Sequence, residues 1–293
     1  TLLSKIEFHT GMNVLDYGCA KGTVMKRLFD KKPTINPHLF DVSTMYEHLW
    51  SKFLTPHQYA SYDPDSSWVG NMDVVTSFFA FEHVLDPKKE LRTIKTLLTR
   101  DGLVYIIVPN TYENIADFIV NDHVHHFSET SLAYLFSQCG LEIVEIDSNS
   151  HFGAFIVIAK NSTHDTLPFE VTSNVLSEIE SDCNQLADYW NRLQNEIRHF
   201  EANNSDKQYA IYGAGVYGNY IATSLNNLEN LACFIDQNEL LHGNTNMGVP
   251  IYPPSKLPDK VTTLYVGLNP KIAKEIIEQM EPLLHRNLNI FYL

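Results

Sequence analysis

Short apolar runs alternate with amphipathic stretches through the first half of the chain. The apolar runs predict buried strands at residues 12–16, 39–41, 73–78 and 103–108, and the amphipathic stretches predict helices at 23–29, 90–98 and 131–139. Strands that alternate with helices are typical of a parallel, doubly wound α/β sheet. Two further apolar runs, 141–146 and 152–159, are separated by a polar turn and predict an antiparallel hairpin that closes this sheet.

The pattern changes after residue 160. A polar stretch at 161–168 predicts a linker. Apolar residues then recur alternately three and four positions apart, at Leu176, Ile179, Cys183, Leu186, Trp190, Leu193, Ile197 and Phe200. Such a heptad seam predicts one long helix. The helix either packs along the domains of its own chain or forms the contact of a homodimer, and the sequence leaves both open.

A second α/β unit follows the long helix. Its predicted strands lie at 209–212, 232–236, 248–251, 263–266 and 289–292, with helices after the strand at 209–212 and at 271–280. We therefore expect a first α/β domain at 1–160, a linker and long helix at 161–206, and a second, smaller Rossmann-like α/β domain at 207–293.

Length and charge narrow the range of functions. A chain of 293 residues exceeds one ordinary core, which supports two domains. Its 35 acidic and 21 basic residues give a formal charge of −14, and such a surface repels nucleic acid. No run approaches the roughly 20 apolar residues of a membrane span, so we expect neither nucleic acid nor membrane as a partner. The four cysteines form no CxxC pair, which favours a reduced, cytoplasmic setting. Because the chain starts at Thr1, we expect upstream residues to be missing.

The loop after the first predicted strand has the composition of a cofactor site. Residues 14–22 read Val-Leu-Asp-Tyr-Gly-Cys-Ala-Lys-Gly, an acid and a glycine turn at the end of a strand. Small residues there let backbone amides approach a ligand. Asp41 ends the next strand, where an acid can accept both hydroxyls of a ribose. The candidate cofactor-binding residues are Asp16, Tyr17, Gly18, Ala20, Gly22, Asp41, Val42 and Phe78. The alternatives are a plain strand-to-helix turn for the loop and ordinary core packing for Phe78.

Four ordered segments carry a family resemblance. Residues 14–22, 73–87, 97–110 and 123–128 resemble motif I, the segment after the fourth strand, the fifth-strand motif and the loop after the fifth strand of class I S-adenosylmethionine (SAM) dependent methyltransferases. The resemblance implies a Rossmann-like sheet and SAM as cofactor, with the first loop around its methionine end. One departure is Ala20, where the family more often has glycine.

A histidine-rich loop follows the fifth predicted strand. Residues 122–127 read Asp-His-Val-His-His-Phe. Methylation of a hydroxyl, or of a carbon beside a ketone, gains from a general base, and histidine titrates in the useful range. Asp122 and His123 resemble the acid–histidine pair that sugar methyltransferases of this type use, and His126 is a second candidate. Three histidines on one loop are weak evidence for a metal, so we expect none.

Three further residues near the same sheet edge are candidates for substrate contact. Glu82 and His83 follow the fourth predicted strand, and Tyr112 follows the fifth. Each of them could face the substrate or play a purely structural part, and the sequence leaves this open.

The second α/β unit has its own glycine loop. Gly213-x-Gly215-x-x-Gly218 follows a strand, and Asp236 ends the next one. Alone, this pattern indicates an NAD(P)-dependent oxidoreductase, but the remaining residues are too few for a further catalytic domain. The whole arrangement resembles bacterial nucleotide-sugar methyltransferases. In these, the small domain helps to hold the nucleotide-linked sugar, which implies a substrate role for Gly213, Gly215, Tyr217, Gly218 and Asp236.

The resemblance implies SAM-dependent methylation of a nucleotide-activated sugar, as in the synthesis of capsule or another surface polysaccharide. The C-methylating members carry an N-terminal zinc module that this sequence lacks, so we expect O-methylation of a sugar hydroxyl. C-methylation of a nucleotide-linked ketosugar is the alternative. A module that binds a nucleotide sugar without catalysis is a further one.

Overall fold

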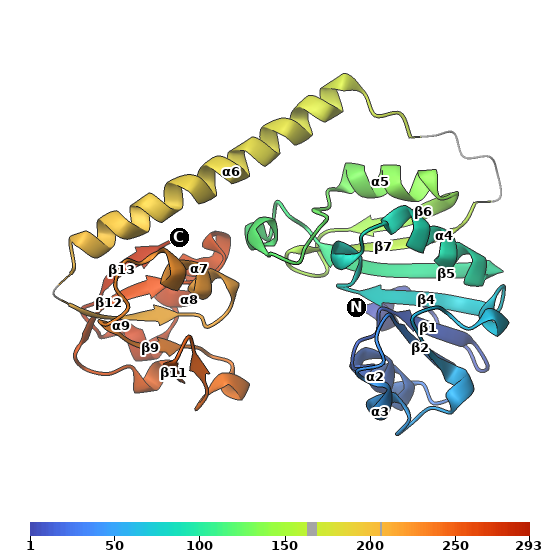
Figure 1. The fold of residues 1–293 in the computed structure, drawn as a ribbon, viewed down its shortest axis with the longest axis horizontal. Helices are drawn as coiled ribbons and strands as arrows, with labels where there is room; N and C mark the ends of the chain where they lie inside the picture. Colours follow the sequence, from blue (N-terminus) through green and yellow to red (C-terminus); the bar gives the residue numbers. More distant parts are fainter. Residues whose placement is uncertain (163–168, 206) are drawn as a thin grey trace. The chain divides into compact units, whose positions relative to one another are not determined.

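The computed structural model describes residues 1–162, 169–205 and 207–293, so most of the predicted linker lies outside the described residues. The chain divides into two compact units, Thr1–Thr172 and Ser173–Leu293 (Figure 1). The long helix belongs to the second unit. No helix among the described residues is long and apolar enough to cross a membrane.

The first unit is built on a sheet of seven strands in the order β3-β2-β1-β4-β5-β7-β6. The strands are β1 (Asn13–Tyr17), β2 (Asn36–Asp41), β3 (Tyr59–Ser61), β4 (Met72–Phe78), β5 (Leu98–Pro109), β6 (Leu141–Asp147) and β7 (Ala154–Asn161). Neighbouring strands from β3 to β5 are parallel, whereas β7 runs antiparallel to both β5 and β6. This order confirms the predicted doubly wound sheet with its closing hairpin.

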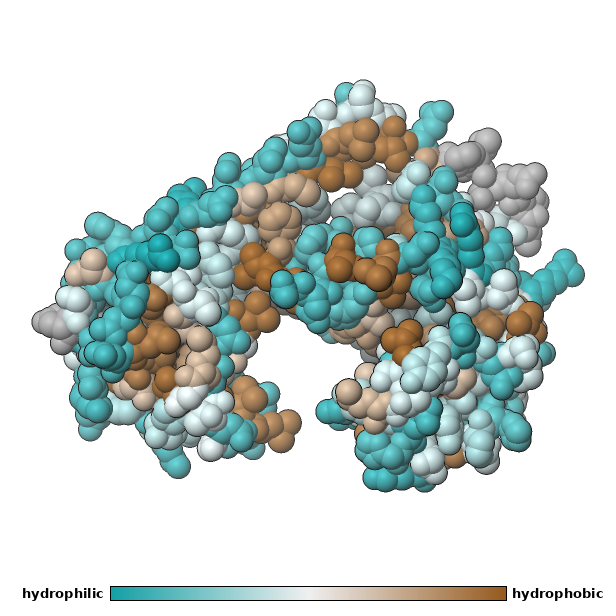
Figure 2. Space-filling view, in the orientation of Figure 1, coloured by the Kyte–Doolittle hydropathy of each residue, from teal (hydrophilic) through white to brown (hydrophobic). Residues whose placement is uncertain are grey.

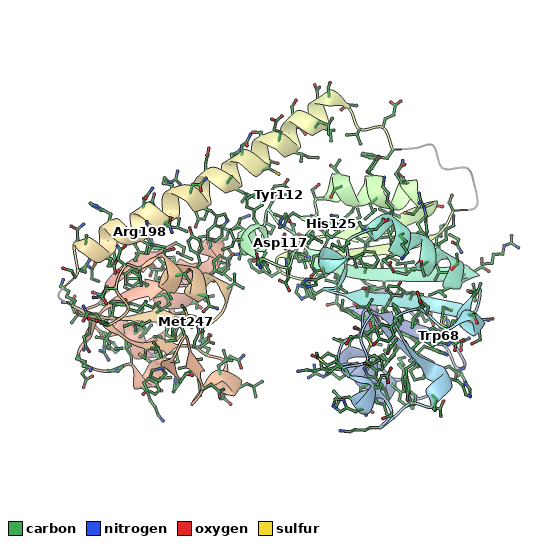
Figure 3. All side chains as sticks on the ribbon, in the orientation of Figure 1. Trp68, Tyr112, Asp117, His125, Arg198 and Met247 are labelled. Carbon is green, nitrogen blue, oxygen red and sulfur yellow. The ribbon has the colours of Figure 1, made fainter. Side chains whose placement is uncertain are left out.

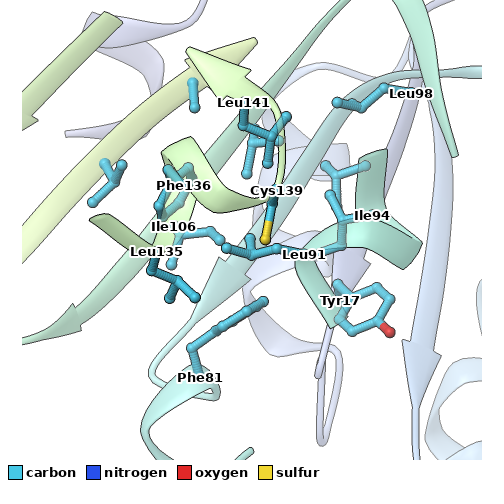
Figure 4. Packing of buried hydrophobic residues seen from close by; sticks show 14 of the residues in the cluster. Tyr17, Phe81, Leu91, Ile94, Leu98, Ile106, Leu135, Phe136, Cys139 and Leu141 are labelled. Carbon is cyan, nitrogen blue, oxygen red and sulfur yellow. The ribbon is translucent and has the colours of Figure 1, made fainter. Parts of the chain in front are cut away.

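Helices cover both faces of this sheet. They are α1 (Leu2–Lys5), α2 (Thr23–Lys31), α3 (Glu47–Trp50), α4 (Pro87–Leu97) and α5 (Glu129–Gln138), with short 3-10 helices η1 (Pro56–Gln58), η2 (Ser66–Trp68), η3 (Phe81–His83) and η4 (Ile115–Ile119). Successive strand residues point to opposite faces. Leu15 of β1 accordingly joins the core with Leu91 of α4 and Phe136 of α5, while Val14 joins the core with Met25 of α2. Figure 4 labels Leu91 and Phe136 in the first of these two cores. Strands covered on both sides read as continuous apolar runs, which made them predictable.

The second unit is a smaller sheet of six strands in the order β10-β11-β9-β8-β12-β13. The strands are β8 (Gln208–Tyr212), β9 (Leu231–Ile235), β10 (Thr245–Asn246), β11 (Val249–Tyr252), β12 (Val261–Val266) and β13 (Asn289–Tyr292). The helices are α6 (Ser173–Ala202), α7 (Val216–Ser224), α8 (Pro270–Glu278) and α9 (Glu281–Leu284), with 3-10 helices η5 (Glu239–Leu241) and η6 (Pro254–Lys256). All neighbouring strands are parallel except the pair β10 and β11, which confirms a Rossmann-like unit.

The heptad seam lies on a single helix, α6, as predicted. Its C-terminal half, with Trp190, Leu193 and Ile197, is buried. The hydroxyl of Tyr220 in α7 donates a hydrogen bond of 2.8 Å to the carbonyl of Trp190. The N-terminal half is different, because Leu176 is 57% exposed; Figure 2 shows this apolar surface near the start of α6. Half of the seam therefore packs on its own unit, and the homodimer stays a prediction for the other half.

Candidate functional site

The loop between β1 and α2 is shaped by three residues with left-handed backbone: Gly18 (φ +77°), Ala20 (φ +44°) and Gly22 (φ +67°). A side chain on Gly18 would come within 2.7 Å of the Cβ of Ala80, so this turn requires glycine. The amides of Gly18 and Cys19 donate to the carbonyl of Phe40 at 2.9 and 3.0 Å, which ties the loop to the end of β2. The contact at Ala80 and the two hydrogen bonds to Phe40 thus fix the shape of this turn at the end of β1.

Asp41 lies against this loop at the end of β2. Its Oδ2 accepts the amide of Ala20 at 2.8 Å and its Oδ1 accepts the amide of Ser43 at 3.2 Å. A carboxylate has about four acceptor positions, so acceptor capacity remains for the hydroxyls of a ribose. The neighbouring Val42 is 70% exposed and offers an apolar surface beside the acid.

Asp16 lies buried beneath the loop, where its Oδ1 accepts the hydroxyl of Thr76 at 3.1 Å. Burial raises the pKa of Asp16 to about 7, the hydrogen bond from Thr76 opposes this, and the charge of Asp41 adds to it. The hydroxyl of Ser77 is also buried and has no hydrogen-bond partner among the described residues. A buried acid and an unpartnered hydroxyl beneath a glycine cradle fit a cationic, polar ligand. The residues present therefore fit SAM.

Two predicted cofactor residues turn their side chains into the core. The Tyr17 hydroxyl donates to Glu90 in α4, and its ring packs on Phe40 at 4.6 Å between centroids. The ring of Phe78 packs on Tyr105 at 5.9 Å. Both side chains therefore have partners within the first unit, and the contact of Tyr17 and Phe78 with the cofactor stays a prediction.

The histidine loop is organised by one buried acid that the sequence did not single out. Asp117 of η4 has a fully buried side chain. Its Oδ1 lies 2.6 Å from Nδ1 of His123, and its Oδ2 lies 3.0 Å from Nδ1 of His126 and 2.5 Å from the hydroxyl of Thr111. Figure 3 labels Asp117 in the segment that follows β5.

The predicted acid partner of His123 was wrong. Asp122 lies instead against His83, whose Nδ1 is 3.0 Å from the Asp122 carbonyl and 3.5 Å from its Oδ2. Asp122 lies in the turn that the His123 amide closes on the carbonyl of Val120 at 3.2 Å, and its carboxylate faces His83 there. The acid–histidine pair exists, but Asp117 supplies the acid from six residues earlier.

Asp117 is held as a carboxylate. Burial would raise its pKa, but hydrogen bonds from His126, Thr111 and His123 outweigh burial and hold the pKa of Asp117 below its ordinary value. A carboxylate only accepts hydrogen bonds, so the Nδ1 atoms of His123 and His126 carry the protons. The Nε2 atom of each ring is then the proton acceptor. This is how a buried carboxylate orients a histidine base.

The segment after β4 meets the histidine loop. The carbonyl of Glu82 in η3 accepts the amides of Val124 and His125 at 2.8 and 3.2 Å. The Glu82 side chain is 1% exposed, and burial raises its pKa to about 7. The rings of His83 and His123 meet edge-on at 4.8 Å. The structure therefore brings Glu82 and His83 to the candidate base, and their contact with substrate stays a prediction.

The cofactor loop and the histidine loop are directly linked. Ala80 touches Gly18 and is followed at once by η3. Both features lie at the carboxyl ends of β1, β4 and β5, the edge where doubly wound sheets bind ligands. Tyr112 at the same edge is half-buried, and its amide donates to Oδ1 of Asn110 at 3.2 Å. Its contact with substrate stays a prediction.

The glycine loop of the second unit repeats part of this geometry. Asp236 accepts the amide of Ala214 at 2.9 Å, as Asp41 accepts that of Ala20. A side chain on Gly213 would come within 2.4 Å of the carbonyl of Gly267, and one on Gly218 within 1.9 Å of the carbonyl of Gly213. These two glycines serve close packing within the unit.

Gly215 and Tyr217 differ from their neighbours in the second loop. Gly215 has nothing within 4 Å of an added Cβ, so there is room at this point of the loop. The ring of Tyr217 stacks on Trp190 of α6, with 6.2 Å between centroids. Gly215 is therefore the position where a ligand can approach the backbone, and the substrate role of this loop stays a prediction.

A comparison with known families agrees with this geometry. The family model described as a methyltransferase domain matches residues 1–146. The first unit is a class I SAM-dependent methyltransferase domain. SAM is accordingly the cofactor of this methyltransferase domain, and its place at the Asp16–Gly22 loop stays a prediction.

A curated relative extends the similarity beyond the methyltransferase domain. C-methyltransferase NovU from Streptomyces niveus is 28% identical over 218 residues, and the match covers 68% of this chain and 51% of that protein. The first unit holds 172 of the 293 residues, so this match reaches into the second unit. The chain spans about half the length of this relative.

Solved methyltransferases show looser similarity. The Haloferax volcanii methyltransferase in complex with Trm112 gives a TM-score of 0.47 at 20% identity, over 55% of this chain and 87% of that one. A SAM-dependent methyltransferase from Aquifex aeolicus gives 0.42 at 19% identity, over 54% and 86%.

Proposed function

We propose that this methyltransferase acts on a sugar carried by a nucleotide, with His123 as general base. The observation that carries the proposal is the buried carboxylate of Asp117, which lies 2.6 Å from Nδ1 of His123 at the edge that holds the cofactor loop. Histidine so oriented is suited to accept a proton near neutral pH. SAM supplies an electrophilic methyl group on a sulfonium.

The work of the protein is alignment and proton transfer. The Asp16–Gly22 loop and Asp41 fix the cofactor, and the loops after β4 and β5 hold the acceptor beside it. Nε2 of His123 takes the proton from the attacking group, so that the electron pair of the broken bond becomes the nucleophile. The proton stays on the imidazole, which Asp117 stabilises as a cation.

The proposal of a nucleotide-linked sugar draws on the second unit. Its glycine loop has room for a ligand at Gly215, and Asp236 accepts the amide of Ala214 in this loop as Asp41 accepts that of Ala20 in the first. NovU is a C-methyltransferase, which favours a carbon beside a ketone as the attacking atom. O-methylation of a hydroxyl is the second candidate, because the same base serves both reactions.

The test is release of S-adenosylhomocysteine across a panel of nucleotide-linked hexoses and ketohexoses. We expect release that depends on one class of sugar. Transfer of a ¹³C-labelled methyl group then separates the two reactions, because NMR couples the label directly to a ring carbon only after C-methylation. No sugar-dependent release across the panel would contradict the proposal.

The base is tested with His123→Ala. We expect turnover to fall by at least about 100-fold, the lower range for loss of a general base. The affinity for SAM should stay the same, since His123 lies outside the cofactor loop. A near-normal rate would remove His123 from this role.

A further inference from the structure

The candidate base His123 and two neighbouring side chains converge as metal ligands do. One donor atom each from Glu82, His83 and His123 lies within 4.8 Å of the other two. Two imidazoles and a carboxylate form a donor set that Zn²⁺ and related divalent ions accept, with an open coordination position. These three residues come from two loops. The set differs from the three histidines of the single loop 122–127, which the sequence indicated only weakly as a metal site.

Both histidines already have the outer support that metal ligands need. A ligating histidine donates its other ring N–H to a carboxylate or a backbone carbonyl. Nδ1 of His123 lies 2.6 Å from Oδ1 of Asp117, and Nδ1 of His83 lies 3.0 Å from the carbonyl of Asp122. In both rings this leaves Nε2 for a ligand.

Glu82 supplies an independent observation. Its side chain is almost fully buried, and its Oε2 has no hydrogen-bond partner among the described residues. A buried carboxylate oxygen without a partner is costly. A cation between Glu82 and the two histidines would satisfy it.

We propose that Glu82, His83 and His123 bind a divalent transition-metal ion of the zinc class, and that the bound ion blocks Nε2 of His123 as a proton acceptor. The ion takes the Nε2 electron pair of His123, so that nitrogen cannot accept a proton from substrate. The blocking effect rests on the proposed function, whereas the metal site does not. Donors around four-coordinate zinc lie roughly 3.3 Å apart, so the three side chains close in by a little over 1 Å. The shift falls to His83, which is 40% exposed and lies in a three-residue 3-10 helix.

The site is tested by titrating the full chain with Co²⁺, without SAM or sugar. The visible absorption of Co²⁺ reports its coordination directly. We expect one saturating equivalent in the wild type, and binding at least about tenfold weaker in Glu82→Gln and in His83→Ala. His9→Ala is the control, because this exposed histidine precedes β1 at the opposite edge of the sheet. Circular dichroism shows that each variant is folded.

Two results would overturn the metal site: no saturable absorption in the wild type, or unchanged binding in both ligand variants. The blocking effect is tested with a sugar that supports S-adenosylhomocysteine release. Zn²⁺ should lower the rate, EDTA should restore it, and Glu82→Gln should be less sensitive to Zn²⁺. If EDTA lowers the rate instead and Zn²⁺ restores it, the ion takes part in catalysis and the blocking effect is wrong. If no sugar supports release, the proposed function fails while the Co²⁺ titration still decides the site.

Discussion

A single buried side chain, Asp117, organises the candidate site. It holds two histidines and a threonine, and its carboxylate fixes which ring nitrogen of His123 is free. The sequence indicated the histidine but not this acid. Asp117 lies in a 3-10 helix that ends at Ile119, whereas His123 lies in the loop beyond it, so no period of one regular element relates the two positions. Asp122 is nearer to His123 in the sequence, and this proximity led to the wrong prediction.

Asp117→Asn tests this assignment against Asp122→Asn. An amide at position 117 would favour the wrong histidine tautomer, so we expect kcat to fall by at least about 100-fold with little change in the KM for SAM. Asp122 is 76% exposed and touches His83, so its amide variant should lose at least about tenfold less. Steady-state kinetics of both variants decide the matter, and equal losses would contradict the assignment.

The buried charge of Asp16 lowers the free energy of unfolding, and we expect the same charge to favour cofactor binding. Burial raises its pKa from 3.8 to about 7, so between these pH values the folded state binds one more proton than the unfolded state. Stability contributed by this group therefore falls as pH rises through that window and stays low above it. Asp16→Asn should raise the free energy of unfolding by at least about 1 kcal/mol at pH 8 and by less at pH 5.5.

The same variant should bind SAM more weakly, because it lacks the buried charge. Urea unfolding at both pH values, with calorimetry of SAM binding, measures the two effects. A variant that is less stable than the wild type at pH 8 would show that the charge of Asp16 does not strain the fold.

At the scale of elements, the sequence predicted the strands that helices cover on both faces. The runs that became β1, β4 and β5 are apolar because helices cover both faces. It missed β3 and β10, which have three and two residues and lie at sheet edges. Strands this short owe their form to pairing with β2 and β11, and such pairing leaves no apolar run to find.

The long helix α6 offers an element-scale prediction. Trp190 is 5% exposed and its ring lies 4.7 Å from that of Tyr220, whereas Leu176 on the same seam is 57% exposed. Trp190→Ala should lower the free energy of unfolding of the second unit by about 3–5 kcal/mol, the usual cost of a large cavity. Leu176→Ala, the matched control, should change it by less than about 0.5 kcal/mol. Urea unfolding of both variants is the measurement, and equal effects would show that the whole seam is buried in solution.

At the scale of the molecule, the chain joins two α/β units that use one local device. In each unit an acid at the end of the second strand accepts an alanine amide of the glycine loop: Asp41 with Ala20, and Asp236 with Ala214. From the sequence alone, each of the two glycine loops was a candidate cofactor site. The family match covers residues 1–146, which include the first loop and not the second.

Because the two units have separate cores, we expect SAM to stabilise the first unit selectively. The three tryptophans are Trp50 and Trp68 in the first unit and Trp190 in the second, so Trp190→Phe leaves fluorescence from the first unit only. S-adenosylhomocysteine at about 100 times its Kd should stabilise that unit by about 2.7 kcal/mol. Fluorescence of Trp190→Phe in urea should show this gain. An unmoved midpoint would contradict cofactor binding in the first unit.

The assignment of SAM to the first loop is tested most directly by calorimetry of S-adenosylhomocysteine binding to Asp41→Ala and its matched counterpart Asp236→Ala. Each variant removes the carboxylate that accepts a loop amide in its own unit. We predict one site in the wild type, affinity lowered about 10- to 100-fold in Asp41→Ala, and unchanged affinity in Asp236→Ala. Absence of binding to the wild type, or loss in Asp236→Ala alone, would contradict it.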